Sequence, residues 1–192
     1  MTKNILLAGV GGQGTILAAK MLTIALMEEG YDVKMSEIHG MSQRGGSVTS
    51  QVRYSDNKVF SPVIEKGTAD ILVAFEEMEA LRNLDYIRPE ATVVVNSERI
   101  PSSTVQTGSE IYYEYVIDEI KKTANNVSVI EASREARQLG NVKAANVILL
   151  GALAQAMHLQ DLDWESIIRC NVKARFADMN LKAFEIGKQA VG

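Results

Sequence analysis

The 192-residue chain contains one cysteine, Cys170, and only two histidines. A single thiol can neither close an internal disulfide nor by itself hold an iron–sulfur cluster or a structural zinc ion. The sequence therefore predicts no metal site. If the protein takes part in redox chemistry, another chain must carry the electrons.

The sequence also lacks an apolar run long enough to span a membrane, a low-complexity tract and a charged tail. Its net charge of −4 gives no general attraction to nucleic acid or to an anionic membrane, and we expect neither as a partner. The length predicts one domain, residues 1–192. Because the first predicted strand begins directly after Lys3, we expect no signal peptide and a cytoplasmic location.

The strongest local motif lies near the N-terminus. An apolar run at residues 5–8 reaches Gly9-x-Gly11-x-x-Gly14, and a long apolar segment follows, which is typical of a buried strand turning tightly into a helix. Glycines permit positive φ and let a phosphate approach backbone N–H groups at the helix N-terminus. The alternative is a tight turn without a ligand. The candidate ligand-binding residues are Gly9, Gly11, Gly12, Gln13, Gly14 and Thr15.

A second glycine-rich loop follows the predicted helix at 12–29 and strand at 31–38. Glu37 stands where dinucleotide-binding domains place the acid that binds a ribose hydroxyl. The loop at 39–47 has no counterpart in the simple nicotinamide-binding pattern. Its guanidinium, hydroxyls and backbone amides suit an oxyanion, although a surface loop with one solvated arginine would also fit. This loop adds Glu37, Ser42, Gln43, Arg44, Gly45 and Gly46 to the candidates.

The rest of the chain predicts an α/β fold. Residues 47–54, a turn at 55–58 and Val59 with Phe60 indicate a β-hairpin. Apolar strands at 71–75, 91–95 and 127–131 alternate with helices at 76–84, 115–124 and 133–139. This pattern predicts a Rossmann-like three-layer domain with a mostly parallel sheet.

Polar residues after two of these strands have predicted roles. Asn96 and Ser97 come where the carboxyl ends of parallel strands gather ligand residues, so Asn96 is a further candidate. Three acids, Glu76, Glu77 and Glu79, should favour a helix N-terminus through its dipole.

The C-terminal part is predicted to be helical. A helix at 142–157 is apolar nearly all round and must be buried, either in the chain's own core or against another subunit. Gly151 in its middle would permit close backbone packing. Asp163 is predicted to cap a helix at 164–171, and a last helix covers about 175–189.

Several motifs together resemble one family over essentially the whole chain. The sequence is similar to the gamma-type subunits of 2-oxoacid:ferredoxin oxidoreductases, and within them to the small beta subunits of the indolepyruvate enzymes. The resemblance rests on Gly9–Gly14, the block from Glu37 to Val48, Ser61-Pro62, Gly67 to Asp70, Phe75-Glu76, Glu79 to Leu81, Asn146, Gly151-Ala152 and Asn180 to Phe184.

The resemblance implies oxidative decarboxylation of an arylpyruvate with coenzyme A, giving an acyl-CoA, CO2 and reduced ferredoxin. It further implies that thiamine diphosphate and iron–sulfur clusters belong to a larger alpha subunit. Residues 9–15 and 42–46 become candidates for the coenzyme A phosphates. A homodimer of this chain is compatible with the same resemblance.

Other functions stay open at this point. Gamma subunits of the pyruvate, ketoisovalerate and oxoglutarate enzymes share both loops. The first loop also fits a self-sufficient NAD- or FAD-dependent oxidoreductase, and the apolar helix fits a subunit that only assists assembly. The sequence offers no convincing acid, base or nucleophile, and a role for His39 or Glu37 would first require proximity to a reacting atom.

Overall fold

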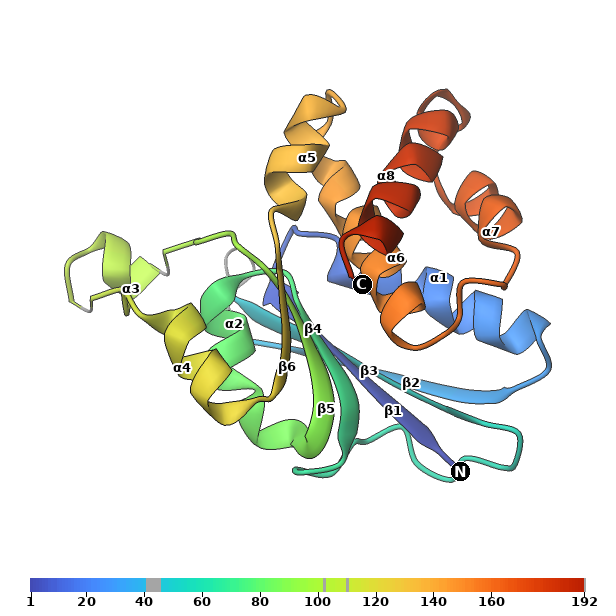
Figure 1. Ribbon diagram of the computed structural model, residues 1–192, viewed down its shortest axis with the longest axis horizontal. Coiled ribbons are helices and arrows are strands. Elements are labelled where there is room, and N and C mark those ends of the chain that lie inside the picture. Colours follow the sequence, from blue (N-terminus) through green and yellow to red (C-terminus); the bar gives the residue numbers. More distant parts are fainter. Residues whose placement is uncertain (41–45, 102, 110, 192) are drawn as a thin grey trace.

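The computed structural model describes residues 1–40, 46–101, 103–109 and 111–191, and only the backbone of residues 103 and 104. A six-stranded sheet lies at its centre, in the order β2-β3-β1-β4-β5-β6 (Figure 1). Strands β1, β4, β5 and β6 are parallel neighbours, whereas β3 runs antiparallel to β1 and β2. The predicted, mostly parallel sheet is confirmed. Its strands are β1 (Lys3–Val10), β2 (Asp32–His39), β3 (Ser47–Ser55), β4 (Ala69–Ala74), β5 (Ile87–Asn96) and β6 (Asn126–Ile130).

Helices cover both faces of the sheet (Figure 1). On one face α1 packs with the C-terminal helices, and Leu7 of β1 joins their core. On the other face Leu6 and Leu72 pack with Ile120 of α4. The three-layer prediction is therefore confirmed. The helices are α1 (Thr15–Glu28), α2 (Glu77–Arg82), α3 (Ser103–Gln106), α4 (Val116–Thr123), α5 (Ala132–Gln138), α6 (Ala145–Ala156), α7 (Trp164–Asn171) and α8 (Ala177–Gln189), with 3-10 turns η1 (Leu84–Tyr86), η2 (Val142–Ala144) and η3 (Ala174–Phe176).

The two central strands explain the apolar runs in the sequence. Every residue of β4 is buried, and so is every residue of β1 after Lys3. Strands without polar alternation are typical of a sheet that is covered on both faces. Within the described residues, no helix is both long enough and apolar enough to cross a membrane.

One predicted strand pairing is wrong. Residues 47–54 lie within β3, but residues 59–60 form no strand beside it. Because β3 pairs with β1 on one edge and with β2 on the other, neither of its edges is free. Val59 instead donates its N–H to Asp32 Oδ2 at 2.7 Å, and Phe60 is exposed. The hairpin of this fold consists of β2 and β3, and the second glycine-rich loop connects them.

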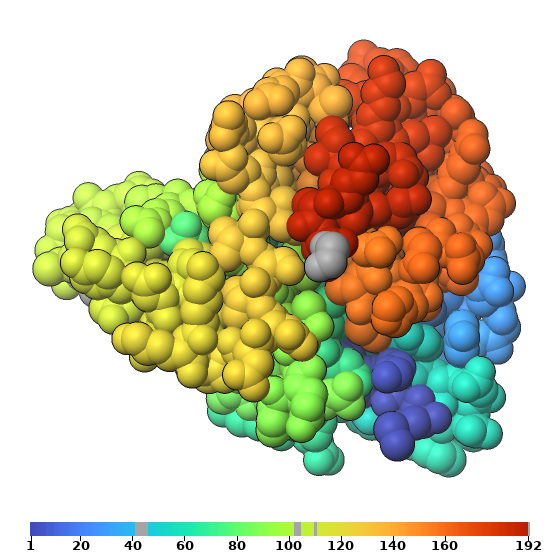
Figure 2. Space-filling view, viewed as in Figure 1, coloured from blue at the N-terminus to red at the C-terminus, as the bar shows by residue number. Residues whose placement is uncertain are grey.

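The segment after β5 stands out from the body of the molecule, as the yellow-green region of Figure 2 shows. Its base is attached to α2. Arg99 Nε donates to Glu77 Oε2 at 2.8 Å, and the Tyr112 hydroxyl donates to Glu76 Oε1 at 2.5 Å. Burial, and then the hydrogen bond to Glu76, raise the pKa of Tyr112 above its usual value. Tyr112 is therefore a neutral donor that packs near the entry to α4.

Helix α6 lies at the centre of the helical part. All residues from 146 to 154 are buried, and the elements that contact α6 include α1, α5, α8 and β5. The chain's own core thus accounts for the burial that the sequence predicted. The α6–α8 crossing is close because two glycines face the opposite backbone. A Cβ on Gly151 would lie 2.1 Å from the Phe184 carbonyl oxygen, and one on Gly187 would lie 1.8 Å from that of Ile148.

This crossing predicts an unusual cost for Gly151→Ala. In an exposed helix the change would stabilise by about 1 kcal/mol. Here the methyl group would meet backbone atoms, so we expect a net loss of roughly 3 kcal/mol in the free energy of unfolding. Urea unfolding measures it. Gly67→Ala is the control, because its Cβ meets nothing within 4 Å and only its positive φ opposes the change. Unchanged or increased stability of Gly151→Ala would contradict the close crossing.

Candidate functional site

The first glycine loop connects β1 to α1 in four residues. Gly12 and Gly14 have φ values of +102° and +83°, which side chains rarely tolerate. Gln13 N–H donates to the Val10 carbonyl at 3.1 Å and closes the turn. Gly14 is the N-cap of α1, no side chain caps the helix, and its first turn has no acid. The positive end of the α1 dipole is therefore directed to the loop without a counter-charge from its own first turn.

The glycines in and next to this loop differ in what a side chain would meet at each position. A Cβ on Gly9 would lie 2.7 Å from Thr15 Oγ1, and one on Gly14 would lie 2.6 Å from Asn146 Nδ2. At these two positions the space for a side chain is filled by other residues of the chain. Among the described residues, nothing lies within 4 Å of the Cβ position of Gly12. Of these three glycines, Gly12 is the one that a ligand can approach from open space.

The side-chain amides of two predicted ligand residues, Gln13 and Asn96, lie beneath the loop and form hydrogen bonds within the chain. Gln13 Oε1 accepts from Val10 N–H at 2.7 Å, and Gln13 Nε2 donates to the Phe75 carbonyl at 2.8 Å. Asn96 Nδ2 donates to the same carbonyl and to Ser133 Oγ, both at 3.0 Å. This network joins the carboxyl ends of β1, β4 and β5 to the start of α5. The two amides thus hold the loop in place from below.

The end of the second glycine-rich loop lies next to the first loop. Gly11 N–H donates to the Gly46 carbonyl at 2.9 Å. Beside it, the Ser47 hydroxyl donates to Glu79 Oε2 at 2.6 Å and so attaches the start of β3 to α2. Ser42, Gln43, Arg44 and Gly45 lie outside the described residues, so their role as ligand contacts stays a prediction.

The buried acids at the start of α2 serve the fold. Glu76 caps α2 by accepting the Glu79 N–H at 2.9 Å, which confirms the predicted helix-terminal role. Glu77 pairs with Arg99 at 2.8 Å, and Glu79 with Arg82 at 2.6 Å. Every one of the three carboxylates therefore has a hydrogen-bonded partner inside the chain.

Three cavities meet at Gly12, which lines all of them. The first, about 660 Å³, is called the strand-side cavity and includes Gly11, Thr15, Lys20 and His39. The second, also about 660 Å³, is called the basic cavity and includes Lys143, Asn146, Lys173, Arg175 and Asn180. The third, about 160 Å³, lies above Phe75, Asn96 and Ser133.

The position of these cavities favours a ligand site. The connection after β1 leads toward β2 at one edge of the sheet, and the connection after β4 leads toward β5 on the other side. Gly12 thus lies at the point where the strand order reverses, beyond the carboxyl ends of β1 and β4, where open α/β sheets bind ligands. Thr15 Oγ1 is buried and has no hydrogen-bond partner among the described residues. An unsatisfied hydroxyl at the start of a helix suits an anion.

Glu37 lies apart from this point. It is on edge strand β2, where its carboxylate is 3.4 Å from His39 Nε2, and it lines none of the three cavities. His39 itself lines the strand-side cavity with Gly40. The acid that would bind a ribose hydroxyl in a dinucleotide site thus contacts His39 and does not itself line the cavities at the glycine loop.

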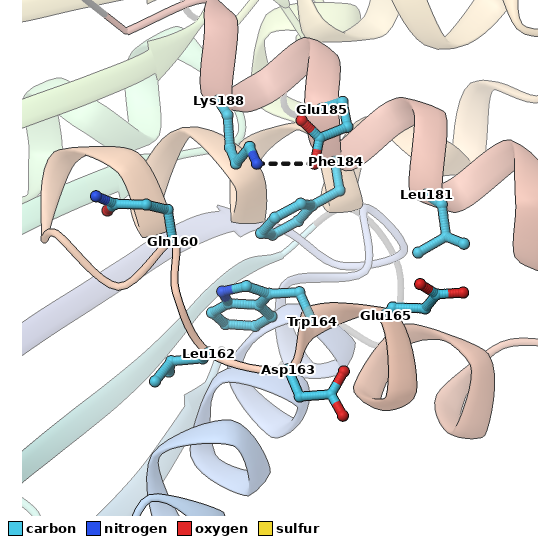
Figure 3. Close-up of a pocket in the computed structure, with 9 residues that line it drawn as sticks. All are labelled: Gln160, Leu162, Asp163, Trp164, Glu165, Leu181, Phe184, Glu185 and Lys188. Carbon is cyan, nitrogen blue, oxygen red and sulfur yellow. Dashed lines mark ion pairs between the residues drawn. The ribbon is translucent and has the colours of Figure 1, made fainter.

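Another cavity, of about 310 Å³, lies between α7 and α8 (Figure 3). The rings of Trp164 and Phe184 pack there with centroids 5.0 Å apart. Its one amine, Lys188, pairs with Glu185 at 2.8 Å. An excess of negative charge makes this cavity unsuitable for a phosphate. The carboxylates that line it are Asp163, Glu165 and Glu185.

Comparison with known proteins decides the family. The sequence pattern of the pyruvate ferredoxin/flavodoxin oxidoreductase family matches residues 4–190. The chain belongs to this family. It is 37% identical to the indolepyruvate oxidoreductase subunit IorB of Thermococcus kodakarensis, over 97% of this chain and 95% of that protein. The family resemblance seen in the sequence is confirmed.

Two solved structures share the fold. A keto/oxoacid ferredoxin oxidoreductase gamma subunit from Geobacter sulfurreducens has a TM-score of 0.71 and 22% identity, over 98% of this chain and 97% of that one. A 2-oxoglutarate:ferredoxin oxidoreductase chain from Magnetococcus marinus has a TM-score of 0.77 and 22% identity. That match covers 98% of this chain but 31% of the other, so this fold can be part of a longer oxidoreductase chain.

The walls of the basic cavity were not predicted from the sequence. Asn146 belongs to the family pattern but had no role, and Lys143, Lys173 and Arg175 belong to no motif. These residues come from segments far apart in the sequence, which only the packing of α6 and α8 brings together. A signal was present in the basic residues at the two helix entries, Lys143 at one and Lys173 with Arg175 at the other.

The network under the loop predicts that Asn96→Asp destabilises the fold. A carboxylate at this buried position would face the Phe75 carbonyl, and we expect a loss of about 2–4 kcal/mol at pH 7. Burial should raise the pKa of the new carboxyl in the folded state. Since the folded state then binds protons more readily than the unfolded state, the loss should shrink as the pH falls from 7 toward 5.

Urea unfolding at pH 7 and pH 5 measures this effect. Asn57→Asp is the matched control, since Asn57 is exposed. Equal losses in the two variants, or a loss at residue 96 that does not depend on pH, would contradict the network.

Proposed function

We propose that this chain is the small, gamma-type subunit of an indolepyruvate:ferredoxin oxidoreductase. The proposed reaction converts an arylpyruvate and coenzyme A into an arylacetyl-CoA and CO2, and the electrons reduce ferredoxin. The meeting of three cavities at Gly12, at the reversal point of the sheet, is the observation that carries the proposal. The full-length similarity to IorB of Thermococcus kodakarensis supports the choice of substrate.

The role of this chain in the reaction is to bind and orient coenzyme A. The residues fit such a ligand. Gly12 leaves its backbone open, Thr15 offers an unpartnered hydroxyl, and the α1 N-terminus supplies positive potential. Arg44 of the second loop would add charge to the same site. The Magnetococcus marinus enzyme, whose structure holds coenzyme A and succinyl-CoA, supports this ligand.

The redox groups are assigned to a partner. Cys170, the only cysteine, is exposed on α7 and cannot alone hold a cluster. The proposal therefore assigns thiamine diphosphate and the iron–sulfur clusters to a larger alpha subunit, through which ferredoxin is reduced. The small share of the Magnetococcus marinus chain that this fold represents supports such a partner. A cytoplasmic location belongs to the same proposal, and a homodimer of this chain stays an alternative assembly.

Two alternatives are less well supported. A self-sufficient NAD or FAD enzyme would use Glu37 for the ribose, but Glu37 lines none of the three cavities at Gly12. A subunit for pyruvate, ketoisovalerate or oxoglutarate would share the glycine loops. Steady-state rates of the assembled complex with each 2-oxo acid distinguish these substrates.

The proposal predicts that Gly12→Ala weakens coenzyme A binding. The added methyl group would stand in the open space that the phosphates approach, and we expect an affinity loss of at least about tenfold, or 1.4 kcal/mol. Calorimetric titration of coenzyme A into the complex of this chain with its large subunit measures it. Arg44→Ala should weaken binding in the same direction.

Gly67→Ala is the matched control for Gly12→Ala. Both glycines have positive φ and open space at the Cβ position, so both variants should lose similar stability. Only Gly12→Ala should lose affinity. Equal affinities of the two variants would contradict phosphate binding at Gly12. If the wild-type complex binds no coenzyme A, the ligand assignment fails altogether.

A further inference from the structure

Three cations line the basic cavity. Lys143 lies in η2, Lys173 immediately precedes η3, and Arg175 lies within η3. None of the three forms an ion pair with a residue that the structure describes. All three are exposed. Three cationic side chains around one cavity repel each other, and an anion placed among them would relieve that repulsion.

The charges around the basic cavity favour an anionic ligand. The chain as a whole has a net charge of −4, yet no carboxylate of the described residues lines the basic cavity. The acid in the first turn of α8, Asp178, instead binds Arg169 at 3.0 Å. Arg175 lies 4.7 Å from the centre of the Phe176 ring, a contact that leaves its N–H donors available. The positive potential of this cavity is therefore local and uncompensated by its lining.

The wall of the cavity also carries fixed polar groups. Asn146 and Asn180 are buried. Asn146 Nδ2 donates to the Gly14 carbonyl at 3.4 Å, and Asn180 Nδ2 donates to the Phe176 carbonyl at 2.8 Å. These bonds hold both amides in place. No described donor binds their oxygen atoms, which leaves acceptors for hydroxyl or amino groups of a ligand.

The strand-side cavity has a different chemistry. Its lining includes Val10, Ile16, Leu17 and Val48, and Lys20 is its one lysine. Both cavities share Gly12, Gly14 and Leu17. A long ligand with one highly charged end and one weakly polar end could cross Gly12 and place each end in matching surroundings.

We infer that the basic cavity holds the nucleotide end of coenzyme A, with its 3′-phosphate among Lys143, Lys173 and Arg175. The inference rests on the proposed function and specifies which end of coenzyme A lies in which cavity. The diphosphate crosses Gly12 at the N-terminus of α1. The pantetheine arm with its thiol then extends into the strand-side cavity, beside His39.

The test compares coenzyme A with dephospho-coenzyme A, which lacks the 3′-phosphate. Both are titrated calorimetrically into the assembled complex, with wild-type chain and with Lys173→Ala/Arg175→Ala. We expect the wild type to prefer coenzyme A about tenfold, and the double variant to lose this preference by weakening coenzyme A alone. The wild-type preference should also decrease at high salt.

Lys121→Ala is the control, because Lys121 is exposed on α4 and lines none of the three cavities. Lys173→Ala alone, which leaves the Arg175–Phe176 contact intact, should lose part of the preference. Thermal unfolding and size-exclusion chromatography show whether each variant folds and assembles.

The outcomes separate the two proposals. If coenzyme A binds but the variants weaken both ligands equally or neither, the 3′-phosphate lies elsewhere and the proposed function stands. If the variants fail to assemble yet the chains fold, the cations bind an acidic surface of the partner subunit, and the inference is overturned. If the wild-type complex binds neither ligand, the proposed function and the inference fail together.

Discussion

The structure depends on the absence of side chains where β1 turns into α1. A methyl group at Gly9 would collide with the Thr15 hydroxyl of α1, and one at Gly14 would collide with the Asn146 amide of α6. This turn sets the position of α1 on the sheet. Helix α6 then packs on α1, and α8 packs on α6 through Gly151 and Gly187. Glycines thus permit close contacts with side chains at the turn and with backbone at the crossing of α6 and α8.

A polar network stabilises the same turn from below. The Phe75 carbonyl accepts from both Gln13 and Asn96, and Asn96 continues the network to Ser133. Buried amides are costly when unpaired and rigid when fully paired. Because these side chains serve the protein's own backbone, the ligand is left to the groups above them. Those are the open backbone of Gly12, the hydroxyl of Thr15 and the neighbouring cavities.

The sequence predicted most of the sheet and helices, because buried parallel strands and a glycine-rich turn leave strong local patterns. It did not predict the partner of β3. Alternating residues indicate a strand but not which of its edges is paired, and β3 uses both. Gln13 and Asn96 were predicted as ligand residues, and the spacing did not show that their amides bond within the chain, since spacing does not show where an amide is directed. The basic cavity was missed because its walls meet only in the folded chain.

The glycine loop alone does not determine the ligand. Any strand-to-helix turn of this type offers N–H groups and a dipole to an anion. Selectivity must come from what is packed beside it, and here the two sides of the loop differ. On one side, α1 brings Ile16, Leu17 and Lys20, and the strands bring Val10, His39 and Val48, so the lining is mainly apolar. On the other, the helical C-terminal part brings three cations and buried amides. The C-terminal helices therefore do more than complete the core, because their entry turns supply the charge that a common loop lacks.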